Sequence, residues 1–147
     1  MMHFLRDGLT LALCCFLIAT GASAIPAQAQ APQVAGRWQC EYATRNIYRT
    51  DAHAVHYQAF INVVPDGTFQ AQGILRNMGG FQAQGRWQVQ QEQGRWAFAA
   101  YGQMASQAWG ITGFAFDSFV VSASQMQMSI QDAASGHEIA SRCTRAG

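Results

Sequence analysis

Acidic and histidine side chains occur together in one short segment, Asp51-x-His53-x-x-His56, and these residue types bind zinc or copper. On a helix His53 and His56 would share one face, but the segment is typical of a loop that runs into a strand. A zinc site needs three or four ligands, and no further ligand follows at a regular spacing. We therefore expect a solvated loop, with a metal site at His53 and His56 as the alternative.

The pair Met126-x-Met128 offers two thioethers, which are soft ligands of the kind that copper binds. The two methionines lie two residues apart, so in a strand they share a face. Methionines on the inner face of a strand usually fill the core. We expect core filling here and predict no cofactor.

Acid-base or nucleophilic chemistry has no recognisable motif in the sequence. It contains no nucleophile elbow, no phosphate-binding loop, no HExxH and no CxxC. Asp66, Glu92 and Asp132 lie in or beside predicted turns, where turn chemistry explains them. The other carboxylates show no spacing that indicates an acid-base pair, so we expect a protein that is not an enzyme.

The N-terminal 24 residues are typical of an export signal. Arg6 supplies a basic start, residues 9–19 are apolar, and Ala22-Ser23-Ala24 is a small-x-small cleavage site. The apolar run is too short to span a bilayer of about 30 Å, which needs roughly 20 residues. We expect export to the periplasm or beyond, with no membrane span in the mature chain.

Cys14 and Cys15 leave with the signal, so Cys40 and Cys143 are the cysteines of the mature chain. Two cysteines in an exported chain, one near each end of the patterned region, predict one disulfide. Free thiols or metal ligation are the alternatives.

The composition excludes some partners. The formal net charge is +1, lysine is absent, and 18 of the 147 residues are glutamine. Because no basic field exists, we expect no nucleic-acid partner.

Alternation of apolar and polar residues runs through nearly the whole mature chain and predicts β-strands. In the strand 81–90, for example, Phe81 and Ala83 face one way and Gln82 and Gln84 the other. The expected strands are 36–42, 57–63, 68–75, 81–90, 95–103, 112–122, 125–131 and 137–143. We predict three segments: a signal peptide 1–24, a flexible leader 25–35 and one domain 36–147. The segments 43–55 and 104–111 are expected to be loops.

Strand number and the cysteines together predict closure of the sheet. If Cys40 faces Cys143 on antiparallel first and last strands, the sheet is a ring and Trp38 faces Arg145. Antiparallel closure requires an even number of strands, which favours eight. The predicted fold class is all-β, a single eight-stranded antiparallel up-and-down barrel closed by a Cys40–Cys143 disulfide.

At this point the chain resembles the calycins, the group of lipocalins, avidins, fatty-acid-binding proteins and small bacterial metalloprotease inhibitors. The resemblance lies in Gly36-x-Trp38 at the start of the first strand. In calycins an arginine or lysine near the end of the last strand packs across this tryptophan. The resemblance implies that role for Arg145, or for Arg142 if the strand has the other phase.

An aromatic cluster in the second half of the domain is the remaining signal. Such side chains either fill a small barrel or line an apolar cavity. The candidate ligand-binding residues are Trp87, Trp96, Phe98, Tyr101, Trp109, Phe114, Phe116, Met126 and Met128. The calycin resemblance implies a non-enzymatic protein that binds a small apolar or amphipathic ligand. Its alternative is a protein-binding or protease-inhibitor-like module that presents the leader or a loop to a protein partner.

Overall fold

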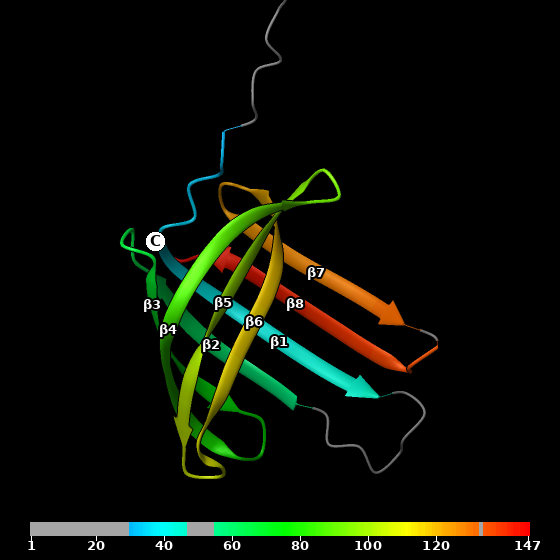
Figure 1. Cartoon of the computed structure of the whole chain (residues 1–147). Coiled ribbons are helices and arrows are strands. Elements are labelled where there is room, and N and C mark those ends of the chain that lie inside the picture. The colour runs from blue at the N-terminus through cyan, green and yellow to red at the C-terminus, as the bar shows by residue number, and fades with distance from the viewer. Residues whose placement is uncertain (1–29, 47–54, 133) are drawn as a thin grey trace, which may run out of the picture.

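The structure is a computed structural model that describes residues 30–46, 55–132 and 134–147. The described residues form eight strands in a closed antiparallel ring, in which each strand lies beside its neighbours in the sequence. The strands are β1 (Gly36–Asn46), β2 (Val55–Val63), β3 (Thr68–Leu75), β4 (Gly79–Glu92), β5 (Arg95–Ser106), β6 (Gly110–Ser122), β7 (Gln125–Asp132) and β8 (His137–Arg145). The predicted fold class, an eight-stranded up-and-down barrel, is confirmed. Figure 1 shows the long strands β4, β5 and β6 curving across the shorter strands.

All eight predicted strands are present, and most extend beyond the predicted bounds. The largest difference is at 104–111, predicted as a loop. Met104–Ser106 belongs to β5 and Gly110 begins β6, so the connection is a turn at residues 107–109. Of the predicted loop 43–55, residues 43–46 belong to β1, Val55 begins β2, and residues 47–54 lie outside the described residues.

The turns use residues suited to their backbone angles. At the β2–β3 turn, the Asp66 carboxylate accepts hydrogen bonds from the Thr68 amide at 2.8 Å and the Thr68 hydroxyl at 2.6 Å. At the β4–β5 turn, Gln93 and Gly94 both have positive φ, 50° and 77°. Two central residues with positive φ are typical of a type I′ hairpin, whose twist matches that of the flanking strands.

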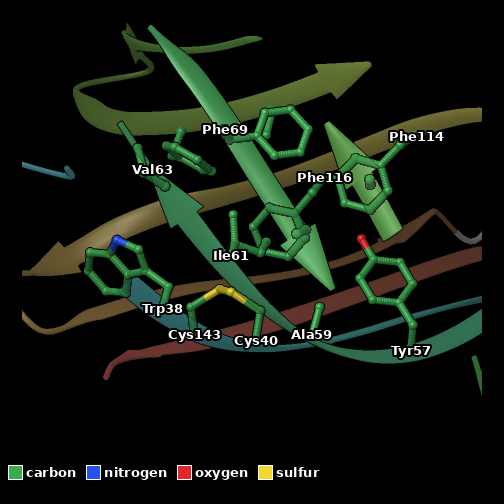
Figure 2. Packing of buried hydrophobic residues seen from close by; sticks show 14 of the residues in the cluster. Trp38, Cys40, Tyr57, Ala59, Ile61, Val63, Phe69, Phe114, Phe116 and Cys143 are labelled. Atoms are coloured by element: carbon green, nitrogen blue, oxygen red, sulfur yellow. A yellow bond between two sulfur atoms is a disulfide. The ribbon is translucent and has the colours of Figure 1, made fainter. Parts of the chain in front are cut away.

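Closure of the ring follows the register that the cysteines predict. Cys40 is directly opposite Cys143, and the two form a disulfide whose side chains are fully buried. Figure 2 shows this disulfide beside the Trp38 ring, under the side chains of β2. The bond joins the first strand to the last, so the ring is closed covalently as well as by its hydrogen-bonded ladder.

Arg145 connects the end of β8 to the start of β1 and to the residues before it. It is directly opposite Trp38, and its guanidinium carbon lies 4.5 Å from the indole centroid. Its guanidinium also donates to the Ala123, Ala35 and Gln33 carbonyls, each at 2.8 Å. Arg142, the alternative, is an exposed residue opposite Glu41. Of the two arginines, the one that contacts Trp38 is therefore Arg145.

The chain just before β1 is held by the same contacts. Val34 is 1% exposed, and its carbonyl accepts a 2.8 Å hydrogen bond from the Trp38 indole. Residues 33–35, placed by the sequence in the flexible leader, thus pack against the barrel. Gly36 has φ +129°, and a Cβ there would lie 2.6 Å from a guanidinium nitrogen of Arg145. The glycine of Gly36-x-Trp38 leaves room for this arginine.

The sequence FQAQG occurs twice, at residues 69–73 and 81–85, and the glycine at the end of each copy allows neighbouring strands to approach closely. A Cβ on Gly73 would lie 2.0 Å from the Gln58 carbonyl oxygen, and one on Gly85 would lie 2.1 Å from that of Tyr101. Strands bend at glycines of this kind, and small barrels need such bends to close. The repeated segment thus marks two places where the sheet curves.

The seam between β6 and β7 is the weakest part of the ring. Only three residue pairs join these strands, with a register shift between Val120 and Ser122, whereas twelve pairs join β4 to β5. Side chains from β2 and β8 donate hydrogen bonds to carbonyls of β6 at this seam. The Tyr57 hydroxyl donates to the Ala115 carbonyl at 3.5 Å, and the Ser141 hydroxyl donates to that of Asp117 at 2.9 Å.

Candidate functional site

Five of the predicted ligand-binding residues lie inside the barrel. Phe98 and Phe116 have no exposed surface and pack edge to face, with ring centroids 6.2 Å apart. Phe114 lies 5.5 Å from Phe69 in the same core, and Figure 2 shows these rings pointing into the interior. Met126 and Met128 are also buried, at 1% and 7% exposure. Their arrangement matches the core-filling alternative, and a ligand role for them stays a prediction.

The other four predicted residues differ in burial: two are half-buried and two are exposed. Trp87 is half-buried, stacks on Phe98 at 6.0 Å and donates its indole hydrogen to the Val64 carbonyl at 2.7 Å. Trp96 is half-buried near the start of β5. Tyr101 points outward from β5 and is 50% exposed, and Trp109 is 42% exposed in the turn before β6. The nine residues therefore do not form one site.

The predicted metal ligands are only partly described. His53 lies outside the described residues, and His56 is half-buried on β2 opposite Ala43. Over residues 30–46, 55–132 and 134–147, no three His, Cys, Asp or Glu side chains are grouped to hold a metal ion. Metal binding at this segment is untested by the structure.

Two adjoining hollows of the described structure lie on the outer face of the barrel. The first groove has a volume of about 760 Å³ and crosses β1, β2, β3, β4 and the end of β5. Its lining includes five glutamines and the exposed apolar side chains of Phe60 and Ile74. The glutamines are Gln39, Gln58, Gln72, Gln82 and Gln107.

A second groove of about 730 Å³ adjoins the first. It is lined by five glutamines together with Asn62, Arg37 and the exposed Ile111. Phe60, Gln72, Gln82 and Ala105 line both grooves, so the two are continuous over the middle of the sheet. This continuous feature is here named the amide trough.

The alternation of the strands places these side chains in the trough. On β3 and β4 the even-numbered Gln70, Gln72, Gln82 and Gln84 point outward, and the odd-numbered residues between them face the core. Register then aligns them, since Gln72 is opposite Gln82 and Gln70 is opposite Gln84. The sequence alone predicts these outward faces but not the curvature that makes them a groove.

Three side chains with raised pKa values lie apart from the trough, on β1, β2 and β6. Tyr42 and Tyr57 stack with centroids 5.0 Å apart, and burial raises the pKa of both. Partial burial also raises the pKa of the Asp117 carboxyl, and the negative charge of Glu92 adds to this effect. Both tyrosines are protonated at neutral pH, as tyrosines ordinarily are, so the Tyr57 hydroxyl can donate to β6.

No protein-family model matches this chain, and no curated protein is similar to it. Solved structures of β-barrels are similar to the chain, and two of them can be described. One is a de novo designed fluorescence-activating β-barrel, 14% identical, with a TM-score of 0.44 over 76% of this chain and 93% of that chain. The other is a redesigned β-barrel, 13% identical, with a TM-score of 0.45 over 77% of this chain and 91% of that chain.

In the described residues no helix is long and apolar enough to cross a membrane.

Proposed function

We propose that this chain is an exported, calycin-like binding protein that holds an uncharged, amphipathic ligand in the amide trough. In this proposal residues 1–24 are removed as a signal peptide, and the barrel acts in the periplasm or outside the cell. The buried Cys40–Cys143 disulfide supports export, because disulfides persist in oxidising compartments. The contact of Arg145 with Trp38 supports the calycin relationship.

One observation carries the proposal, namely that uncharged amides and exposed apolar side chains share one continuous groove. Exposed large apolar side chains that gather in a concave surface are typical of binding sites. Phe60, Ile74 and Ile111 are 43%, 63% and 76% exposed in and beside a lining of amides. The sequence predicted an interior ligand site, and the proposal moves the ligand to the outer face.

Nuclear magnetic resonance with a neutral amphipathic probe tests this function. Dodecyl maltoside, added below its micelle concentration to the exported chain, is expected to shift the signals of Phe60, Gln72 and Gln82. Shifts centred instead on Phe98 and Phe116 would place the ligand inside the barrel and overturn the proposal. Absence of binding would overturn it as well.

A pair of charge substitutions gives the matched control. Phe60→Asp places a carboxylate in the shared part of the trough, and we expect it to weaken probe binding at least tenfold. Val121→Asp changes an equally apolar side chain, 61% exposed on β6 and outside both grooves. It should leave probe binding unchanged.

The second candidate function, a protein-binding module, is favoured by the β5–β6 turn. Trp109 and Ile111 are exposed two residues apart there, and exposed tryptophan is enriched at protein interfaces. If a protein recovered with the exported chain is lost from a Trp109→Ala variant, while the probe fails to bind the trough, this second function replaces the first.

A further inference from the structure

One row of outward side chains crosses six strands without a break. Each member is directly opposite the next, as the register of the five strand pairs shows. The row is Gln39, Phe60, Gln72, Gln82, Ala105 and Ile111. Strands lie about 4.8 Å apart, so the row follows the curved surface for about 24 Å. Its length is suited to an extended chain rather than to one small molecule.

The amides along this row are free to bind. Among the described residues, the side chains of Gln72 and Gln82 make no hydrogen bond to the protein, whereas Gln58 donates to Glu41 at 3.1 Å. Each glutamine amide carries one acceptor oxygen and two donor hydrogens. A ligand in the trough therefore meets donors and acceptors at closely spaced positions, which hydroxyl groups can satisfy in either direction.

Charge excludes ionic ligands. The first groove has no ionisable side chain in its lining, and the second has only Arg37. The Arg37 guanidinium lies 5.9 Å from the centre of the Phe60 ring, where the ring face stabilises its charge. A polyanion or polycation would lose water here without gaining a set of counter-charges.

The glutamine amides of the trough and the closed sheet disfavour two other classes of ligand. A hydrocarbon chain without a polar head would cover the glutamine amides without satisfying their hydrogen bonds, and each buried unpaired amide disfavours binding. A peptide that adds a strand needs an open sheet edge, but β2, β3, β4 and β5 each have a neighbour on both sides. The remaining class is uncharged, rich in hydroxyl groups and apolar on its ring faces.

We propose that the amide trough binds a neutral oligosaccharide chain that lies across β2, β3, β4 and β5. The exposed ring of Phe60 packs against the C–H face of one sugar, and the amides of Gln72 and Gln82 bind hydroxyls of the next. This inference rests on the proposed function and names its ligand class.

Titration calorimetry with three neutral hexasaccharides tests the inference: maltohexaose, cellohexaose and hexa-N-acetylchitohexaose. We expect at least one to bind. Phe60→Ala should weaken that binding at least tenfold, and Gln72→Ala and Gln82→Ala about fivefold each. Gln88→Ala and Gln90→Ala remove outward glutamines of the same β4 strand outside both grooves, and they should leave binding unchanged.

Failure of this inference is distinguishable from failure of the proposed function. If dodecyl maltoside still shifts Phe60 and Gln82 but none of the three hexasaccharides binds, the saccharide inference is wrong and the trough remains a binding site. If a hexasaccharide binds equally to the Phe60→Ala and Gln88→Ala variants, its site lies outside the trough and the inference is also wrong. Loss of both kinds of binding overturns the proposed function itself.

Discussion

The guanidinium of Arg145 lies 4.5 Å from the indole centroid of Trp38, on residues directly opposed across β8 and β1. The same guanidinium donates to the carbonyls of Ala35, Gln33 and Ala123. One side chain therefore joins the entry to the first strand, the last strand and the turn before β7. Its removal leaves three carbonyls without their donor.

Arg145→Ala should lower the free energy of unfolding by about 2–4 kcal/mol, because several charge-assisted hydrogen bonds and the cation–π contact are lost together. Urea denaturation followed by tryptophan fluorescence measures this loss. Arg142→Ala, on the exposed face of the same strand, should cost less than about 0.5 kcal/mol. Equal losses in the two variants would contradict the role assigned to Arg145.

Removal of the disulfide by a Cys40→Ser, Cys143→Ser double variant should lower stability by up to about 4–5 kcal/mol, the chain-entropy value for a loop of this length. The bond closes a separation of 103 residues. Both cysteines are fully buried, so dithiothreitol should reduce the folded barrel only as fast as it unfolds. Rapid thiol labelling under native conditions, followed by mass spectrometry, would contradict this burial.

Gly73→Ala should destabilise the barrel by about 3 kcal/mol or more, because the new Cβ would lie 2.0 Å from the Gln58 carbonyl oxygen. Gly113 is the control, since it lies in β6 and a Cβ there meets nothing within 4 Å. Gly113→Ala should be neutral or stabilise by up to about 1 kcal/mol. Thermal unfolding by circular dichroism separates the two, and similar melting temperatures would refute the close approach of β2 and β3.

Ser141→Ala should cost about 1–2 kcal/mol, since the Asp117 carbonyl at the β6–β7 seam loses its donor. The same hydroxyl lies 3.1 Å from that of Ser118, and both serines are buried. Hydrogen exchange should become faster in β6 and remain unchanged in β4. Ser129→Ala, an exposed position on β7, serves as the control and should change neither exchange nor stability.

Asp117→Asn should stabilise the protein at pH 7 and have no effect near pH 3. Partial burial raises the pKa of the Asp117 carboxyl in the folded state above its usual 3.8. At a pH between 3.8 and the folded pKa, the folded state therefore binds more protons than the unfolded state. Its contribution to stability is therefore present below pH 3.8 and is lost as the pH rises through the folded pKa. The gain in melting temperature should not exceed about 2 °C.

Asp66 is the control for Asp117, because its pKa is shifted in the opposite direction. The Thr68 hydrogen bonds lower the pKa of its carboxyl, so its contribution is present above 3.8 and is lost as the pH falls through the folded pKa. Asp66→Asn should therefore lower the melting temperature at pH 7 rather than raise it. A variant pair that shifted in the same direction at pH 7 would contradict the assignment.

The fold could be predicted because simple rules act on nearly every residue. Alternation assigns Phe81 and Ala83 to the core and Gln82 and Gln84 to the outside, and the structure agrees. The two cysteines then set the register of the first and last strands. Neither inference needs a distance that the sequence does not contain.

The candidate site could not be predicted in the same way. In the predicted strand 95–103 both faces carry aromatic and small residues. The alternation of residue types therefore does not show that Tyr101 points outward. The groove depends on how sharply the sheet bends, and a bend is a property of neighbouring backbones. The sequence shows Gly73 and Gly85 at the same place in two FQAQG segments, but it does not show the contacts that these glycines make with the next strand.

Closure by the Cys40–Cys143 bond also determines how the protein responds to mechanical load. A force that pulls Gly36 and Arg145 apart passes through Cys40 and Cys143, and the covalent bond carries it between them. The chain segment between the two cysteines, which are 103 residues apart in the sequence, then bears no tension. Residues 36–39 and 144–145 lie outside the bridge and can extend under load, so Arg37 and Gln39 can leave the amide trough while the rest of its lining stays in place.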